Sequence, residues 1–288
     1  PRFLFQTEQH VRAAANIRFA LLNHDSFVVI SGGIGTGKTT VLNSALKELG
    51  PQFITARIVH TTLTCIELLQ SLLSEFGIPN YGTKKVRLLD ELRHYFLEQH
   101  QAGRHVVIIV DEAQHLSPAL LEELRLLTCI DSQDRKIVTI VLTGQPALDE
   151  VLDDESLMQL RQRTRLRQRL RPLDQADTIA YMQHRLKVAG GELNQIFNPD
   201  TLPEIHRLTM GTPRLINTLA DMSLMACLAA QKRRVDLEVV KSVVDELGWR
   251  WERAGGRRAP DPGEKAETAP SGERPSLLVH HPGARVTR

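Results

Sequence analysis

The stretch Gly32-Gly33-Ile34-Gly35-Thr36-Gly37-Lys38-Thr39 decides the fold, because it satisfies the pattern G-x-x-x-x-G-K-[ST]. It follows the aliphatic run Phe27–Ser31 and precedes a helical pattern, which is the strand–loop–helix context that this motif requires. Glycines let such a loop bend so that successive backbone N–H groups face inward and surround phosphates, and the helix N-terminus adds a positive end. The alternative is a glycine turn that carries a surface lysine, which the flanking strand and helix disfavour.

The residues after the glycines carry the chemistry of this predicted phosphate site. Lys38 is expected to reach the β- and γ-phosphates of a nucleotide, and the Thr39 hydroxyl to ligate Mg²⁺. The nucleotide-binding residues predicted in this loop are Gly32, Gly33, Ile34, Gly35, Thr36, Gly37, Lys38, Thr39 and Thr40.

Two carboxylates end a second aliphatic run. Val106–Val110 is followed directly by Asp111 and Glu112. A strand this apolar is buried on both faces, so its acids emerge at the carboxyl edge of a parallel sheet, where α/β proteins bind ligands. Asp111 can hold Mg²⁺ through water, and Glu112 can polarise a water for attack on the γ-phosphate. An adjacent acidic pair is common on loops, and it gains weight here because a phosphate-binding motif accompanies it.

Polar residues also follow the aliphatic run Ile140-Val141-Leu142. If this strand lies between the other two, Thr143 or Gln145 can orient the attacking water. The alternative is an ordinary exit from a strand into a turn, Thr-Gly-Gln-Pro, and the sequence does not choose between the two.

The alternation of β-branched runs and helical patterns up to Pro172 predicts an α/β fold with a parallel sheet and flanking crossover helices. The expected strands are Phe27–Ser31, Phe53–Val59, His105–Val110, Ile137–Thr143 and Arg163–Leu170. A helix is expected over Glu8–Leu22. Two further helices should pack on the sheet through the faces formed by Ile66, Leu69, Leu72, Leu73 and Phe76, and by Val86, Leu89, Leu92 and Phe96.

Strand patterns stop after Pro172. Asp174–Leu247 predicts four helices, separated by Gly190-Gly191, Asn198-Pro199 and Gly211-Thr212-Pro213. From Glu252 onward Pro, Gly, Arg and Glu dominate, and such a composition cannot bury enough apolar surface to offset the entropy of ordering. We therefore expect a nucleotide-binding core over 1–172, a small all-helical domain over 173–248 and a disordered tail or linker over 249–288.

The composition excludes several classes of protein. In 288 residues, 36 Lys and Arg balance 34 Asp and Glu, for a formal net charge of +2, which is ordinary for a globular chain. The longest aliphatic run, Val106–Val110, is far shorter than the roughly 18 residues that a membrane-spanning helix needs. Cys65, Cys129 and Cys227 match neither a disulfide framework nor a zinc spacing, which fits a reducing compartment.

Arginines alternate with other residues from Arg161 to Arg171. Period two places them on one face of an extended strand, which a fully covered central strand cannot tolerate, so we expect this strand at the edge of the sheet. A solvated edge that discourages aggregation accounts for most of these arginines. Arg161 or Arg163 is better placed to reach a neighbouring subunit's nucleotide as an arginine finger. A nucleic-acid patch is a further alternative that the net charge supports only weakly.

Taken together, these motifs resemble those of the AAA+ ATPases of the P-loop class, and among them the ExeA-type group of the general (type II) secretion pathway, with relatives in pilus and exopolysaccharide loci. The resemblance runs from about Pro1 to Leu247. This chain departs from the group at Thr164, where Ile is usual, and in the density of its arginines. Besides the phosphate loop, the segments that carry the resemblance are Pro1-Arg2-Phe3-Leu4-Phe5, Val110-Asp111-Glu112-Ala113-Gln114-His115-Leu116-Ser117, Leu142-Thr143-Gly144-Gln145-Pro146, Leu160-Arg161-Gln162-Arg163, Leu170-Arg171-Pro172-Leu173 and Gly211-Thr212-Pro213-Arg214-Leu215-Ile216-Asn217.

The resemblance implies where the site residues lie. The strand carrying Thr143 would lie between the strands that end at Gly32 and Asp111, and residues 173–248 would form a lid. Thr143 or Gln145 would be the sensor beside the catalytic water. Arg214, at the start of a helix that Pro213 opens, would be the lid arginine that contacts the γ-phosphate. Arg161 and Arg163 would be fingers between the subunits of a homo-oligomer.

The function that the resemblance implies is Mg²⁺-dependent hydrolysis of ATP by a switch that acts on secretion or envelope assembly proteins. The resemblance places this switch in the cytoplasm, either free or at the cytoplasmic face of the inner membrane. Relatives often continue into a transmembrane helix and a periplasmic peptidoglycan-binding region, and neither is expected within these residues. Two alternatives stay open: a DNA-associated ATPase of transposition or replication loading, and a regulatory module that binds nucleotide without hydrolysing it. The Asp-Glu-Ala-Gln run is also similar to that of helicases, but the chain has no room for their second motor domain.

Overall fold

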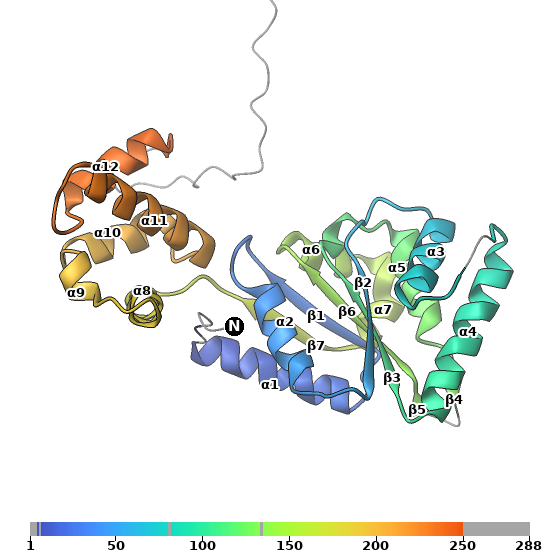
Figure 1. The fold of residues 1–288 in the computed structure, drawn as a ribbon. Helices are drawn as coiled ribbons and strands as arrows, with labels where there is room; N and C mark the ends of the chain where they lie inside the picture. Colours follow the sequence, from blue (N-terminus) through green and yellow to red (C-terminus); the bar gives the residue numbers. More distant parts are fainter. Residues whose placement is uncertain (1–4, 6, 80–81, 133–134, 250–288) are drawn as a thin grey trace, which may run out of the picture. The chain divides into compact units, whose positions relative to one another are not determined.

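The computed structural model describes residues 5, 7–79, 82–132 and 135–249. Their central element is a five-stranded sheet in the order β2-β3-β6-β1-β7, in which every neighbouring pair is parallel (Figure 1). The predicted parallel sheet is confirmed, and so is the place of the strand carrying Thr143, because β6 lies between β1 and β3. The strands are β1 (Phe27–Gly32), β2 (Phe53–Ile58), β3 (His105–Val110), β6 (Val138–Gly144) and β7 (Thr164–Leu170).

Helices cover both faces of this sheet. Alternate side chains of a strand point to opposite faces, and the buried residues divide accordingly: Val29, Ile108 and Ile140 belong to one apolar cluster, and Val28 and Ile109 to another. The first cluster is completed by α3 (Cys65–Glu75), α4 (Lys85–Gln101) and α5 (Pro118–Leu127), and the second by α1 (Glu8–Leu22) and α2 (Lys38–Lys47) (Figure 1).

The remaining elements of this region are short. They are the 3-10 helices η1 (Ala113–His115) and η2 (Glu155–Leu157), the helices α6 (Ala147–Leu152) and α7 (Met158–Arg163), and the strands β4 (Asp131–Ser132) and β5 (Arg135–Lys136). The strands β4 and β5 form an antiparallel pair that the sequence did not indicate.

Two residues placed on the sheet-facing sides of α3 and α4 are instead exposed. Val86 is 71% exposed and Ile66 is 36% exposed, whereas Leu68 and Leu88 are fully buried. The buried stripe of each helix is therefore rotated toward a residue that the predicted face omitted. Burying a leucine side chain is worth about 1.5–3 kcal/mol, so the two leucines decide the orientation of these helices.

The arginine-rich strand lies at the edge of the sheet, as predicted, but it begins one residue late. Arg161 and Arg163 belong to α7, and extended structure starts at Thr164. The hydroxyl of Thr164 donates to the carbonyl oxygen of Leu160 at 3.0 Å, which closes the last turn of this helix. The alternation of arginines thus crosses from helix to strand, and the first two do not share the strand's face.

The helical region has an apolar core of its own. It contains five helices where four were predicted: α8 (Gln175–Val188), α9 (Leu193–Ile196), α10 (Thr201–Thr209), α11 (Pro213–Ala229) and α12 (Leu237–Glu246). The extra helix, α9, is a single turn in the segment between Gly191 and Asn198, too short to produce a periodic pattern. Its Leu193 is buried in the same cluster as Phe197, Ile205 and Val240.

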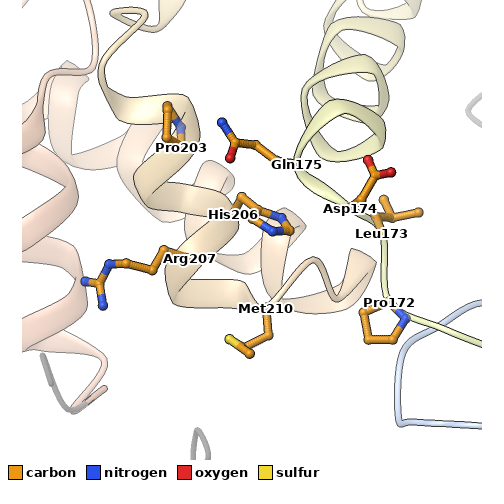
Figure 2. Close-up of a pocket in the computed structure, with 8 residues that line it drawn as sticks. All are labelled: Pro172, Leu173, Asp174, Gln175, Pro203, His206, Arg207 and Met210. Carbon is orange, nitrogen blue, oxygen red and sulfur yellow. The ribbon is translucent and has the colours of Figure 1, made fainter. Parts of the chain in front are cut away.

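Where the chain enters the helical region, at Leu173, its backbone is hydrogen-bonded to the backbone of the turn before α11. The N–H of Leu173 donates to the carbonyl oxygen of Gly211 at 2.8 Å. A Cβ on Gly211 would lie 1.8 Å from the carbonyl oxygen of Leu173, so glycine is required there. Beside this contact, α8 and α10 line an open pocket of about 580 Å³, with the imidazole of His206 at its wall (Figure 2).

The C-terminal prediction lies mostly outside the described residues. The tail expected over 249–288 begins at Trp249, which is described and packs against the core of the helical region; the remainder falls outside the structure's description. Within residues 5, 7–79, 82–132 and 135–249, no helix is both long enough and apolar enough to span a membrane. The three cysteines are described, and all are free thiols.

A buried histidine lies at the start of β3. His105 Nε2 is 2.8 Å from the Thr139 hydroxyl, and its ring is within 4.2 Å of the ring of His24, centroid to centroid. Burial, reinforced by the neighbouring His24 and His100, lowers the pKa of His105 from 6.5 to about 3. The folded protein therefore keeps this imidazole neutral at pH values where the unfolded chain protonates it.

We expect this histidine to make the fold sensitive to acid. In the unfolded chain this imidazole binds a proton below pH 6.5, and in the folded chain only near pH 3. The free energy of unfolding therefore decreases as the pH is lowered through this interval, by about 2.5 kcal/mol from pH 7 to pH 4.5. The double variant His105→Phe/Thr139→Val, which removes both hydrogen-bonding partners, should lack this loss in urea unfolding at the two pH values. His94→Phe, an exposed histidine on α4, is the control. Equal pH dependence in the wild type and the double variant would contradict the assignment.

Candidate active site

The glycine-rich loop lies between β1 and α2, as its sequence requires. Gly35 and Gly37 have φ of +77° and +96°, which residues with a Cβ rarely adopt. The Lys38 ammonium donates to the carbonyl oxygens of Gly32 and Gly33 at 2.9 and 3.0 Å. Lys38 is thus held over the loop that it is predicted to serve. The other predicted loop residues lie with it, Ile34 half-buried and Thr39 and Thr40 exposed on the first turn of α2.

The charge environment of Lys38 shows what lies near it. Burial lowers the pKa of this ammonium below its usual value, and the negative charges of Glu112 and Asp111 oppose that effect. The phosphate loop and both carboxylates therefore lie at the same edge of the sheet, within electrostatic reach of one another.

Asp111 is bound by residues from two neighbouring strands. The Thr143 hydroxyl, from β6, donates to its Oδ1 at 2.5 Å. The Arg57 guanidinium, from β2, has its Nε 3.7 Å from Oδ2 and donates through Nη2 to Asn43 Oδ1 at 2.9 Å. Thr143 thus orients the predicted metal-binding carboxylate, a contact in addition to its predicted role beside water.

Glu112 has an unusual backbone and a carboxylate held by two amides. Its φ is +50°, in the left-handed region that few residues other than glycine adopt. The side-chain amides of Gln114 and Gln145 donate to its Oε2 at 2.7 and 3.4 Å, and the Gln145 N–H donates to Gln114 Oε1 at 3.1 Å. Gln114 therefore links Glu112 to the end of β6.

These contacts set the protonation state of Glu112. Burial raises the pKa of its carboxyl, but the hydrogen bonds from Gln114 and Gln145 and the positive charges of Lys38 and His115 together hold it below its usual value. Glu112 is thus ionised at neutral pH, as a general base must be. His115 lies at the margin of this site, with its Nε2 3.1 Å from Gln114 Nε2.

The donor set suits magnesium. Within the described ranges, no group of three or more His, Cys, Asp or Glu residues can hold a metal by itself. Mg²⁺ is commonly bound by one or two protein oxygens together with substrate phosphates and water. The Thr39 hydroxyl and the Asp111 carboxylate beside a phosphate-binding loop fit that requirement.

The start of α11 approaches the phosphate loop. A Cβ on Gly35 would lie 2.6 Å from the Cβ of Arg214 and 3.3 Å from the Thr212 methyl group. Arg214 is exposed, so its guanidinium is accessible beside the loop. The helical region therefore brings its predicted lid arginine to the edge of the sheet that carries the phosphate loop.

Comparisons with known proteins agree with this geometry. The model of the family described as "AAA domain" matches residues 21–152. General secretion pathway protein A of Aeromonas hydrophila is 38% identical over 257 residues, which cover 86% of this chain and 47% of the relative. The chain has the AAA+ fold, and over most of its length it is similar to general secretion pathway protein A. It spans about half the length of that relative.

The chain is also similar to a phage DNA activator in sequence and to several solved AAA+ proteins in structure. The ATP-dependent target DNA activator B of Escherichia phage Mu is 31% identical over 147 residues, which cover 50% of this chain and 42% of the relative. Among solved structures, Cdc6p of Pyrobaculum aerophilum has a TM-score of 0.65 at 16% identity, covering 84% of this chain and 68% of the other. The ORC2 protein of Aeropyrum pernix has a TM-score of 0.62 at 17% identity, covering 83% and 67%. At these identities the solved structures show the AAA+ fold alone.

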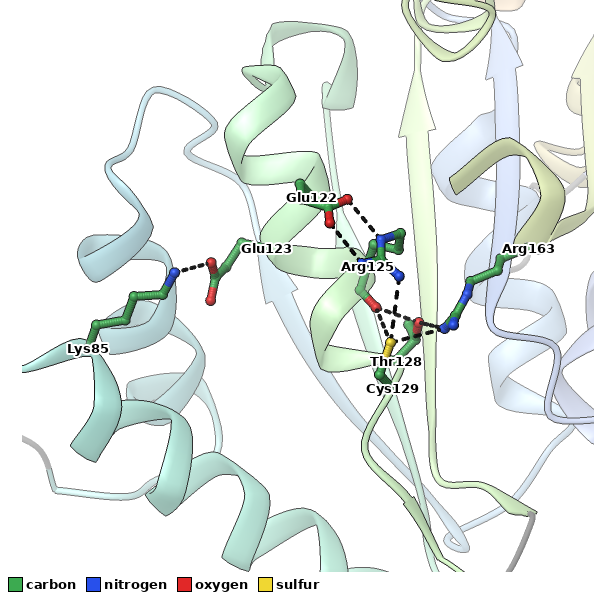
Figure 3. A network of polar contacts seen from close by, with 7 residues as sticks. All are labelled: Lys85, Glu122, Glu123, Arg125, Thr128, Cys129 and Arg163. Carbon is green, nitrogen blue, oxygen red and sulfur yellow. Dashed lines mark hydrogen bonds and ion pairs between the residues drawn. The ribbon is translucent and has the colours of Figure 1, made fainter. Parts of the chain in front are cut away.

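The two predicted finger residues differ in their surroundings. Arg163 donates to the Thr128 hydroxyl at 3.3 Å and to Cys129 Sγ at 3.2 Å, both directly after α5 in its own chain (Figure 3). Arg125, which also donates to Cys129 Sγ, is bound in turn by Glu122. Arg161 makes one long contact, 3.5 Å from Nη1 to the carbonyl oxygen of Asp153. Arg163 is thus engaged within its chain, and Arg161 is more available to a neighbouring subunit.

Two arginines of β7 form ion pairs. Arg165 Nη1 lies 3.1 Å from Asp25 Oδ1, and Arg167 Nη1 lies 2.7 Å from Asp153 Oδ1. Their charge is partly neutralised within the AAA+ core. This agrees with the explanation of the arginine row as a solvated edge.

Some residues of this site gave no clear sequence signal. Arg57 belongs to an edge strand, and His10, whose Nε2 lies 3.1 Å from the carbonyl oxygen of Thr36 in the phosphate loop, belongs to the first helix. Neither residue lies in a motif. Gln114 is part of the Asp-Glu-Ala-Gln segment, but only the fold shows that it bridges β3 and β6.

We expect Gln114 to lower the pKa of Glu112 and thereby to set the acid limb of the pH profile of kcat. Gln114→Leu removes a hydrogen bond that favours the ionised carboxylate, so the pKa of Glu112 should rise. The acid limb of the pH profile of kcat should then move to higher pH, which a steady-state phosphate-release assay between pH 5 and 9 would measure. Gln101→Leu, an exposed residue on α4, is the matched control. An unchanged acid limb in Gln114→Leu would show that this hydrogen bond does not set the pKa of Glu112.

Proposed function

We propose that this chain binds ATP and hydrolyses it with Mg²⁺ and Glu112 as the general base. The observation that carries the proposal is the placement of Lys38 within reach of the charges of both Asp111 and Glu112, at the loop built for phosphates. The match to the AAA domain and the similarity to general secretion pathway protein A support the same proposal.

Each residue has a distinct task in this proposal. The loop N–H groups and Lys38 bind the phosphates, and Thr39 and Asp111 are the residues that would hold magnesium. The metal, when bound, supplies positive charge against the phosphate oxygens. Glu112 accepts a proton from the attacking water, which Thr143 or Gln145 orients, and Arg214 contacts the γ-phosphate from the lid. The rate enhancement comes from positioning and electrostatics, with no covalent intermediate.

Two substitutions separate binding from hydrolysis. Lys38→Ala removes the ammonium that contacts the phosphates, and it should abolish ATP binding in equilibrium titration with a fluorescent ATP analogue. Glu112→Gln keeps the shape but not the base, so ATP should still bind while turnover falls by roughly 10²–10⁴-fold. Lys47→Ala, at the far end of α2, is a control for the loss of a lysine. Normal turnover by Glu112→Gln would refute the catalytic assignment.

We further propose that the active form is a homo-oligomer in which an arginine finger acts between subunits. Arg161 is the better candidate, because Arg163 is bound to Thr128 and Cys129 of its own chain.

Arg161→Ala should lower turnover by roughly 10³-fold or more with little change in ATP affinity. Arg163→Ala should instead lower the free energy of unfolding by about 1 kcal/mol. Mixing Arg161→Ala subunits with Glu112→Gln subunits should restore part of the turnover, because some interfaces then pair an intact finger with an intact base. Failure of the mixture to exceed either variant alone would argue against a finger in trans.

The cellular role that we propose is assembly of secretion or envelope machinery, by analogy with general secretion pathway protein A. ATP binding would draw Arg214 toward the loop, and hydrolysis would release that closure to act on a partner protein. Deleting the gene should impair assembly of such machinery. The wild-type chain should restore assembly and the Glu112→Gln chain should not.

A DNA-associated role is the second candidate, because of the similarity to target DNA activator B. Phosphate contacts by the arginines of α7 and β7 would make DNA binding fall steeply with salt, and a titration at several salt concentrations tests this. The pairing of Arg165 and Arg167 with acids of the same chain weighs against it. Magnesium-dependent turnover would exclude a module that only binds nucleotide.

A further inference from the structure

A histidine of α1 lies against the phosphate loop. His10 is 6% exposed, and its Nε2 lies 3.1 Å from the carbonyl oxygen of Thr36. Because a carbonyl oxygen only accepts, Nε2 carries the proton and donates it. Nδ1 lies 2.7 Å from the hydroxyl of Thr7, which also accepts from the N–H of His10 at 3.4 Å. The hydroxyl proton is thus directed to Nδ1, and this pairing fixes the imidazole in one tautomer.

The carbonyl that His10 holds belongs to the peptide unit between Thr36 and Gly37. In a trans peptide the C=O and the following N–H point in opposite directions. With the Thr36 oxygen held toward α1, the Gly37 N–H points to the other side, and phosphate-binding loops work through such N–H groups. A rotated peptide would present an oxygen to the phosphates, which would repel them.

This peptide unit needs an external restraint. Gly37, with φ of +96°, lacks the Cβ that limits rotation elsewhere in a chain. The carbonyls of Gly32 and Gly33 are held by Lys38, and that of Gly33 also by the Thr36 hydroxyl at 2.8 Å, so these bonds come from the loop and its own helix. The bond to the Thr36 oxygen comes from another helix, 26 residues earlier in the chain. A Cβ on Gly37 would lie 3.2 Å from His10 Nε2, so ring and loop are in close contact.

We propose that His10 is a positioning residue for the phosphate loop, which fixes the Thr36–Gly37 peptide with its N–H available to phosphate. The inference rests on the proposed function, because it concerns how the same site binds ATP. It predicts a loss of binding that affects ground state and transition state alike, so KM rises while kcat is unchanged.

The first test compares side chains at this position. His10→Leu should weaken binding of N-methylanthraniloyl-ADP about tenfold and raise KM for ATP by a similar factor, at constant kcat, as loss of one hydrogen bond implies. His10→Gln can place an amide N–H where Nε2 stood and should stay within about threefold of wild type. In His10→Asn the side chain is too short to reach Thr36, so this variant should lose affinity as His10→Leu does. It replaces His10→Leu in the binding test if His10→Leu does not fold. His94→Leu, an exposed histidine on α4, is the control.

The second test needs no nucleotide. Hydrogen–deuterium exchange over residues 33–40 should be faster in His10→Leu than in wild type and near wild type in His10→Gln, while exchange over α12 stays unchanged. Equal exchange in the loop, binding within twofold of wild type for His10→Leu, or no rescue by His10→Gln would overturn the inference. If the wild type bound no nucleotide, the proposed function would fail and the exchange result alone would decide the role of His10.

Discussion

The pairing of β6 with both β1 and β3 is the constraint on which the site depends. Its register places Gly144 beside Ser31 and Leu142 beside Val110, so the three strands end together. Backbone hydrogen bonds thereby bring the phosphate loop, the carboxylates and the Thr-Gly-Gln turn to one edge. A slip of one residue would turn every side chain of β6 to the other face. The burial of β6 on both faces makes such a slip costly, because Thr139 and Thr143 would exchange places with aliphatic neighbours.

The edge so formed is held by polar contacts that cross between strands. Thr143 reaches from β6 to Asp111, Arg57 reaches from β2 to the same carboxylate, and Gln114 joins Glu112 to the start of the turn after β6. Each acid is therefore bound from a neighbouring element. Glu112 combines a left-handed backbone with a carboxylate that accepts hydrogen bonds from Gln114 and Gln145, and such strained residues cluster at functional sites.

The sequence predicted the parts of this arrangement that depend on local pattern. The glycine loop and the aliphatic strands agree with the structure, and so does the order of β1, β6 and β3, which the resemblance to a known family implied and local pattern left open. The same reasoning did not find contacts between distant segments, such as Arg57 with Asp111 or His10 with Thr36, because the residues of each pair are far apart in the sequence and share no motif. It also erred where periodicity is ambiguous. Val86 fits a helical face as well as Leu88 does, and only packing distinguishes the two.

The two apolar clusters of the sheet and the single cluster of the helical region have no residue in common. A substitution inside the helical cluster therefore leaves the packing around the sheet intact, and the reverse also holds. The interior of the helical region can consequently vary in sequence while the strand ends keep their geometry, as long as Arg214 at the start of α11 keeps its place beside Gly35. Separate cores thus let one arrangement of strand ends coexist with helical regions of different shape.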